Sequence, residues 1–148
     1  MNKILVTGGL GYIGSHTVVE LQKEGFEVII IDDLSNSSIE VIDKITSITG
    51  IKPEFEQIDL KEKETVAAFF EKYSIDGVIH FAASKAVGES VNEPLKYYEN
   101  NISTLTYVLK SMAANNINNI IFSSSCTVYG QADELPITEN APTKPAES

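Results

Sequence analysis

Five short apolar segments alternate with amphipathic segments along the chain. The apolar segments favour strands because they are rich in β-branched residues, and the third is the weakest of them. They lie at residues 3–7, 27–31, 54–58, 76–82 and 119–123. The second is apolar almost throughout, as is typical of a parallel sheet that helices cover on both faces.

The segments between the strands repeat apolar residues three or four positions apart, which predicts amphipathic helices. The first repeat is Ile13, Thr17, Val18 and Leu21; the second is Ile39, Ile42, Ile45 and Ile48; the third is Val66, Phe69, Phe70 and Tyr73; the fourth is Leu95, Tyr98, Ile102, Leu105, Leu109 and Met112.

Local signals mark the ends of these helices. Gly25 and Gly50 follow the first two repeats, where glycine commonly ends a helix. The segment Ser-Ser-Ile-Glu at residues 37–40 has the form of a capping box before the second repeat. Pro94 is expected at the first position of one long helix, where its missing N–H costs nothing.

Strands and helices in strict alternation predict an α/β fold, a doubly wound parallel sheet with the order 3-2-1-4-5. The 148 residues suit a single domain. We expect that domain to occupy residues 1–125. Residues 126–148 lack periodicity and contain three prolines, which predicts an irregular tail.

Charge and cysteine content narrow the classes of function. A net charge of −10 argues against nucleic acid and against anionic membrane surfaces as partners. An anionic ligand would therefore need local hydrogen-bond donors. Cys126 is the only cysteine, and the chain begins without a signal-peptide pattern, so we expect a cytoplasmic protein. We interpret Cys126 as a small packing residue, and we predict no metal site.

A glycine-rich segment follows the first strand, with the sequence T-G-G-L-G-Y-I-G from Thr7 to Gly14. Gly8 suits a turn that a Cβ would block, Gly11 lets the backbone approach a pyrophosphate, and Gly14 lets a helix pack closely. The helix amino terminus would supply N–H donors for the phosphates. The alternative is a tight turn that needs glycine for its shape alone.

Asp32 ends the second strand, where a carboxylate accepts hydrogen bonds from an adenosine ribose and disfavours a 2′-phosphate. Together with the glycines, it predicts a Rossmann-type site for NAD rather than NADP. Asp33 is an equally good candidate for a turn cap. His80 lies within a strand, and we expect a core residue there with its polar atoms satisfied.

Four stretches resemble the extended short-chain dehydrogenase/reductase family, and in particular its UDP-glucose 4-epimerases. They are T-G-G-L-G-Y-I-G-S-H-T-V-V-E-L from Thr7, V-I-H-F-A-A-S-K-A-V-G-E-S from Val78, P-L-K-Y-Y-E-N-N from Pro94 and I-F-S-S-S-C-T-V-Y-G from Ile121. The resemblance runs colinearly through the chain. The sequence differs from the usual family residues at Asp33, Ala83 and Cys126.

The resemblance implies further roles around the cofactor. It assigns Tyr12 and Ile13 to the diphosphate; Asn36 and Ser37 to the ribose; Asp59 and Leu60 to the adenine; Phe81, Ala82, Ala83 and Lys85 to the diphosphate and nicotinamide; Asn100 to bracing that loop; and Ser123 to the nicotinamide. Ser125 matches the serine that binds the reacting sugar hydroxyl. From the residues alone, Asp59 could equally cap a helix, Lys85 could be a solvated surface residue, and the serines could form turns.

The resemblance also implies a reaction: reversible hydride transfer at C4 of a UDP-hexose, with NAD as the cofactor. The Tyr-x-x-x-Lys pair of the family does not occur in the sequence, and colinearity places its tyrosine about two positions beyond Ser148. We therefore expect a truncated fold that is inactive alone, and apolar surface exposed on the last strand and on the 95–112 helix. A homodimer is compatible with the resemblance.

Three alternatives stand beside this interpretation. A non-catalytic NAD-binding module would need only the cofactor site. An epimerase for another UDP-sugar would share every motif in this sequence. A sugar 4,6-dehydratase is disfavoured, because that branch usually has an Asp-Glu pair where Cys126 and Thr127 follow Ser125.

Overall fold

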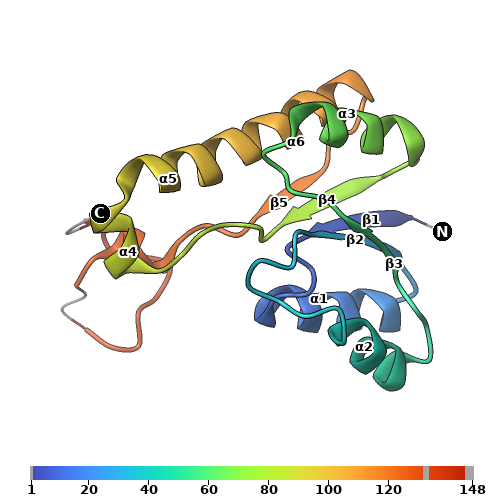
Figure 1. Cartoon of the computed structure of the whole chain (residues 1–148). Helices are drawn as coiled ribbons and strands as arrows, with labels where there is room; N and C mark the ends of the chain where they lie inside the picture. The colour runs from blue at the N-terminus through green and yellow to red at the C-terminus, as the bar shows by residue number, and fades with distance from the viewer. Residues whose placement is uncertain (1, 132–133, 146–148) are drawn as a thin grey trace.

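The predicted strands form one parallel sheet in the order β3-β2-β1-β4-β5, which confirms the predicted topology. The computed structural model describes residues 2–131 and 134–145. The strands are β1 (Lys3–Thr7), β2 (Glu27–Asp32), β3 (Glu54–Gln57), β4 (Gly77–His80) and β5 (Ile120–Phe122) (Figure 1). Since β4 pairs with β1, the sheet reverses its winding direction between these two strands.

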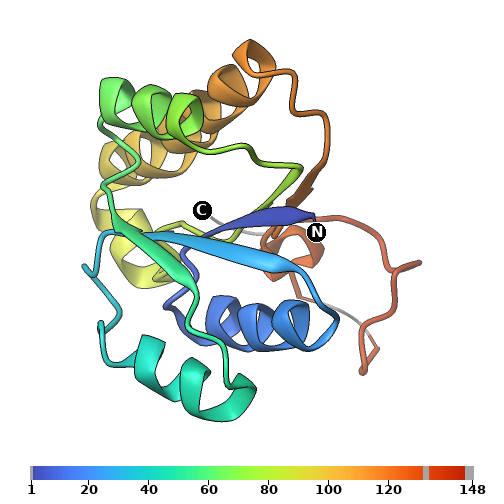
Figure 2. The ribbon, with the colours of Figure 1, turned by 90° about the vertical axis from the view of Figure 1, so that its right-hand side faces the viewer.

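Helices cover both faces of the sheet (Figures 1 and 2). α1 (Tyr12–Lys23) and α2 (Val41–Thr49) lie on one face, and α3 (Lys63–Lys72) and α6 (Thr104–Ala114) lie on the other. This arrangement explains why the central strands are apolar on both faces.

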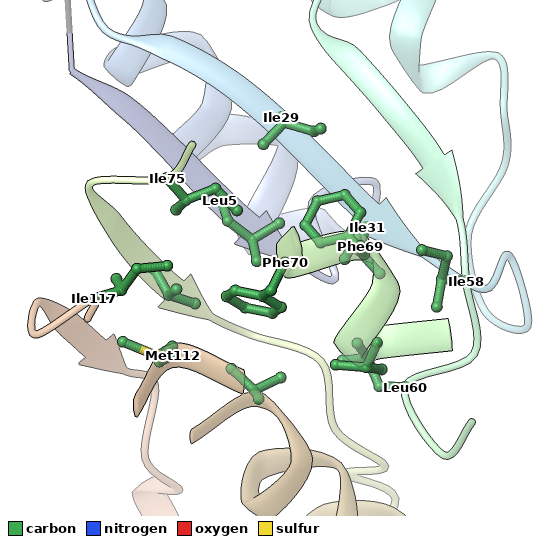
Figure 3. Packing of buried hydrophobic residues seen from close by; sticks show 13 residues of the cluster. Leu5, Ile29, Ile31, Ile58, Leu60, Phe69, Phe70, Ile75, Met112 and Ile117 are labelled. Carbon is green, nitrogen blue, oxygen red and sulfur yellow. The ribbon is translucent and has the colours of Figure 1, made fainter. Parts of the chain in front are cut away.

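Consecutive residues of β1 face the two halves of the core. Leu5 packs with Phe70 and Met112 under α3 and α6, and Figure 3 shows this cluster around the Phe70 ring. Val6 packs with Val18 on the α1 side. Each fully buried side chain of this size stabilises the fold by roughly 1.5–3 kcal/mol, so the sheet fixes the framework that carries the loops.

The buried face of α1 is offset from the predicted one. The structure buries Gly14, Val18, Val19 and Gln22, whereas Ile13 is exposed. The apolar repeat therefore predicted the helix but not its rotation. Gly14 accounts for the difference, because its missing side chain lets α1 approach the turn after β1 and directs the Gly14 side of the helix inward.

The predicted capping box before α2 is wrong. Glu40 occupies the N-cap position without a side-chain hydrogen bond, and the Ser37 hydroxyl donates to Asp32 instead. Within the isoleucine repeat, Ile42 and Ile45 are buried but Ile39 and Ile48 are exposed. Ile39 precedes α2; within the helix, steps of three residues turn by about 300°, so the repeat has rotated away from the core by Ile48.

The predicted long helix after Pro94 is interrupted. It consists of α5 (Pro94–Tyr98), a π-helical turn at Glu99–Ser103, and α6. A short helix, α4 (Val87–Asn92), precedes it and was not predicted, because its residues form no apolar stripe. None of the α4 residues is buried.

Apolar side chains are exposed on β5 and along α5 to α6, as the sequence predicted. Ile121 is 63% exposed and Leu95 is 81% exposed. After β5 a 3₁₀ helix spans Cys126–Tyr129, and no strand or α-helix follows it within 130–131 and 134–145. Residues 132–133 and 146–148 of the predicted tail lie outside the described residues. None of the described helices has the length and hydropathy of a membrane span.

Candidate functional site

The predicted site residues meet along one edge of the sheet, because they follow the carboxyl ends of parallel strands. The glycine segment 8–14 follows β1, residues 33–37 follow β2, residues 59–60 follow β3, and residues 81–85 follow β4. Ser123 and Ser125 follow β5, and Asn100 belongs to the π turn. Open parallel sheets bind ligands at this edge, beside the point where the winding direction reverses.

Two glycines of the turn after β1 allow contacts that a side chain would block. Gly8 has φ +67°, and a Cβ at this position would lie 2.8 Å from the Ala82 amide nitrogen. A Cβ on Gly14 would lie only 2.2 Å from the Gly8 carbonyl oxygen. The turn is therefore held between the end of β4 and the first turn of α1, as the motif predicted.

The amino end of α1 offers hydrogen-bond donors. The Ser15 amide donates to the Gly11 carbonyl at 2.9 Å and closes the first helical turn. Within the described residues, the amides of Tyr12, Ile13 and Gly14 have no backbone acceptor. A Cβ on Gly11 would meet only the Gly8 carbonyl within 4 Å, so this side of the turn is open. Free amides at a helix amino terminus favour an anionic group.

The carboxylate of Asp32 connects three parts of the site. Its Oδ2 accepts from the Leu10 amide at 3.0 Å, and its Oδ1 accepts from the Leu34 amide at 3.0 Å and the Ser37 hydroxyl at 2.7 Å. The residue is 8% exposed. Asp32 therefore fixes the glycine turn relative to the loop after β2, a positioning role that the sequence did not predict.

Asp33 forms the turn that was the alternative to a cofactor role. Its Oδ1 accepts from both the amide and the hydroxyl of Ser35, at 2.9 and 2.6 Å. Leu34, between the two, has φ +62°, a conformation that costs a non-glycine residue about 1–3 kcal/mol and is concentrated at functional sites. Asn36 is exposed at the tip of this loop.

Thr7 and His80 join β1 to β4 where the winding direction reverses. The Thr7 hydroxyl and His80 Nδ1 are 2.8 Å apart, and the His80 ring stacks on Phe122 at a centroid distance of 6.0 Å. Burial lowers the pKa of His80 to about 4, so the ring is neutral at pH 7. The prediction of a satisfied core histidine is confirmed.

Two asparagines of the π turn hold the loop after β4. The Asn101 side chain accepts from the Ser84 amide at 2.8 Å and donates to the Ser84 carbonyl at 2.9 Å. Asn100 donates to the Ser84 hydroxyl at 3.1 Å, so it braces the loop as predicted. The role of Asn101 was missed, because an α-helical spacing would not direct two consecutive side chains at one residue.

The side chains of the remaining predicted site residues, which follow β3 and β4, differ in how exposed they are. Lys85 and Ala83 are exposed, whereas Phe81 and Ala82 are half-buried beside the glycine turn. Leu60 is buried in the core under α3.

Asp59 accepts from the Lys61 amide at 2.9 Å and pairs with the Lys61 ammonium, whereas Glu62 holds the N-cap position of α3. The helix-cap alternative for Asp59 is therefore wrong.

Beyond β5, the serines are exposed. The Ser125 hydroxyl accepts from the Thr127 amide at 3.3 Å and lies 2.7 Å from the Thr127 hydroxyl, so it caps the 3₁₀ helix. Cys126 is exposed, which overturns its interpretation as a packing residue. The 3₁₀ helix Cys126–Tyr129 buries none of its residues, so it offers the Cys126 side chain no core to pack in.

A doubly wound parallel sheet with an open glycine turn, free helix amides and a carboxylate on the neighbouring strand defines a dinucleotide-binding α/β protein. Residues 4–148 match the NAD dependent epimerase/dehydratase family, and the chain belongs to that family.

Relatives extend this assignment. The UDP-glucose 4-epimerase of Neisseria meningitidis serogroup B is 51% identical over 142 residues, which cover 96% of this chain and 42% of that protein. Two solved UDP-glucose 4-epimerases are also similar. One, from Stenotrophomonas maltophila with bound NAD and formylated UDP-arabinopyranose, has a TM-score of 0.89 and 46% identity, covering 97% of this chain and 43% of that chain. The other, from Bifidobacterium longum in complex with NAD+ and UDP, has a TM-score of 0.90 and 45% identity with the same coverage. The chain thus spans less than half the length of these relatives.

Proposed function

We propose that this chain is the NAD-binding part of an enzyme that interconverts UDP-glucose and UDP-galactose. The observation that carries the proposal is the adjacency of free α1 amides and the Asp32 carboxylate at the edge where the sheet reverses. The identity of about one half to a UDP-glucose 4-epimerase supports the choice of reaction.

The cofactor site follows from this arrangement. The amides of Tyr12 and Ile13 would hold the diphosphate, and the open side of Gly11 gives it room to approach. Asp32 would bind the adenosine ribose and repel a 2′-phosphate, and the chain contains no arginine to offset that repulsion. The remaining proposed contacts are those of Gly8, Gly14, Asp33, Asn36, Ser37, Asp59, Leu60, Phe81, Ala82, Ala83, Lys85, Asn100 and Ser123.

When bound, NAD supplies reversible hydride transfer at C4 of the hexose. The role of Ser125 would be to orient the sugar hydroxyl, because its side chain lies beyond β5 at the same sheet edge. We assign residues 1–125 to the NAD-binding domain and 126–148 to a connecting tail. Since the sequence has no Tyr-x-x-x-Lys pair to accept the hydroxyl proton, the chain alone would not turn over substrate. The unpaired, exposed Cys126 supports a reducing, cytoplasmic location.

Titration calorimetry with NAD and NADP tests the proposal. We expect NAD to bind with clear preference, because the buried carboxylate disfavours a 2′-phosphate. Equal affinity for the two cofactors, or binding of neither, would contradict the Asp32 argument. Epimerase turnover of UDP-glucose by the purified chain would contradict the assignment of proton transfer to residues outside it.

We further propose that the chain associates with a second copy through α5 and α6. Leu95, Tyr98, Ile102 and Leu109 are exposed along α5, the π turn and α6. Exposed apolar side chains gathered along one segment favour burial against a partner.

A further inference from the structure

Asp32 has little capacity left for a ligand in this structure. A carboxylate offers about four acceptor positions, two on each oxygen. The Leu34 amide and the Ser37 hydroxyl fill both positions of Oδ1, and the Leu10 amide fills one position of Oδ2. One position of Oδ2 therefore remains open.

A ribose diol presents two hydroxyl groups to this carboxylate, so one open position is not enough for both. The two amides cannot leave, because they belong to the backbone of the glycine turn and of the strained turn at Leu34. The Ser37 hydroxyl is the donor that can leave, since rotation about a single side-chain bond releases it. Ser37 is also only half-buried, so its hydroxyl can then bond to water.

We propose that the Ser37 hydroxyl occupies, in the free chain, the acceptor position that a ribose hydroxyl takes when the dinucleotide binds. Ser37 thereby sets the affinity of Asp32 for a diol by competing with it. This inference rests on the proposed cofactor site, and it reverses the role expected for Ser37, from a contact that adds affinity to a donor that must be displaced.

The loop contains a matched control for this competition. The Ser35 hydroxyl donates to Asp33 Oδ1 at 2.6 Å, just as the Ser37 hydroxyl donates to Asp32 Oδ1 at 2.7 Å. Ser35→Ala removes the same chemical group from the same loop but leaves Asp32 unchanged. A comparison of the two variants therefore separates competition at Asp32 from a general loosening of the loop.

The experiment is calorimetric titration of the unaltered chain, Ser37→Ala and Ser35→Ala with NAD, ADP and 2′-deoxy-ADP. We expect Ser37→Ala to lower the Kd for NAD and ADP about tenfold, because a hydrogen bond to a charged group no longer has to be broken. The Kd for 2′-deoxy-ADP should change less than about twofold, since a single hydroxyl fits the open position. Ser35→Ala leaves the bonds of Asp32 in place, so it should not reproduce the difference between ADP and 2′-deoxy-ADP.

Weaker binding of NAD and ADP to Ser37→Ala, or an equal change for ADP and 2′-deoxy-ADP, would overturn this inference alone. Failure of the unaltered chain to bind NAD or ADP would instead overturn the proposed function, and this inference with it. The two failures are therefore distinguishable in one set of titrations.

Discussion

The Asp32 carboxylate accepts a hydrogen bond from the Leu10 amide across 22 positions of sequence, at a distance of 3.0 Å. One side chain at the end of β2 thus determines where the turn after β1 lies. Asp32, the residue expected to bind a ribose, therefore also stabilises the fold. Its replacement should change the stability of the chain before any ligand is added.

Replacement of Asp32 by alanine would leave the Leu10 and Leu34 amides without their acceptor. We expect the free energy of unfolding to fall by about 3 kcal/mol, because buried donors without partners are costly. Urea unfolding followed by circular dichroism measures this change. Asp33→Ala is the control; since Asp33 is exposed and only caps a turn, its loss should cost less than about 1 kcal/mol. Equal losses in both variants would show that Asp32 has no special structural role.

A methyl group on Gly14 would overlap the Gly8 carbonyl, because its Cβ would lie 2.2 Å from that oxygen. Gly14→Ala must therefore displace α1, at a cost of roughly 1–3 kcal/mol in stability. NAD affinity should fall by at least about tenfold, since the donor amides move with the helix. Gly88→Ala is the matched control, because a Cβ at Gly88 meets nothing within 4 Å. An unchanged NAD affinity in Gly14→Ala would show that NAD binding does not depend on the position of α1.

Stability should depend on pH through His80. Its pKa in the folded chain is lowered to about 4 by burial, from an ordinary value of 6.5. The unfolded chain therefore binds more protons between these values, and stability present above pH 6.5 is lost as the pH falls toward 4. At a pH of about 4, the loss in the free energy of unfolding approaches roughly 3 kcal/mol. Urea unfolding at a series of pH values between 6.5 and 4.5 measures it, and His80→Asn should flatten the profile. A profile of the same slope in that variant would assign the effect to other groups.

The contact between Asn101 and Ser84 should stabilise the loop after β4. Asn101→Ala removes the partners of both the amide and the carbonyl of Ser84, which should cost about 1–2 kcal/mol. Hydrogen exchange at the Ser84 amide should accelerate in the same variant. Asn92→Ala serves for comparison, because Asn92 makes only an exposed bond to the Gly88 carbonyl. If exchange at Ser84 is the same in both variants, the loop is held by other contacts.

Self-association should depend on the exposed apolar side chains of α5 and α6. Leu95→Glu places a charge on a side chain that is 81% exposed, so folding should be unaffected while a dimer would be disfavoured. Sedimentation equilibrium of the unaltered chain and the variant measures the difference. Leu135→Glu is the control, because Leu135 is as exposed but lies in the segment after β5. A chain that is monomeric before any substitution would refute the proposed dimer.

The sequence predicted the features that depend on short-range backbone requirements. The glycine turn and Asp32 lie where the motif placed them, because a turn without Cβ atoms and a carboxylate at a strand end are properties of a few adjacent positions. The topology followed from the order of the strands. Which face of each helix is buried could not be predicted from the apolar repeats. The rotation of α1 depends on how closely Gly14 approaches Gly8, and Ile48 is exposed because a strict repeat of three residues rotates away from the buried face of α2.

Side-chain partners were the least predictable part of the site. Ser37 fits a capping box by its spacing, yet its hydroxyl donates to Asp32, because the loop after β2 turns back over the strand end. The role of Asn101 likewise cannot be predicted from a helical repeat of apolar residues. Its contact with Ser84 exists only because the π turn changes the spacing of the helix.

A π turn contains one residue more than an α turn across the same length of helix. Deleting one residue within 99–103 should therefore convert this turn to α-helix, with α5 and α6 still presenting the same faces to their neighbours. If the deleted residue is Asn100 or Asn101, Ser84 loses one of its two amide partners while Val108 and Met112 stay in the core. The extra residue of the π turn is therefore needed for the contacts with the loop after β4, and it is not needed for the packing of α6 on the core.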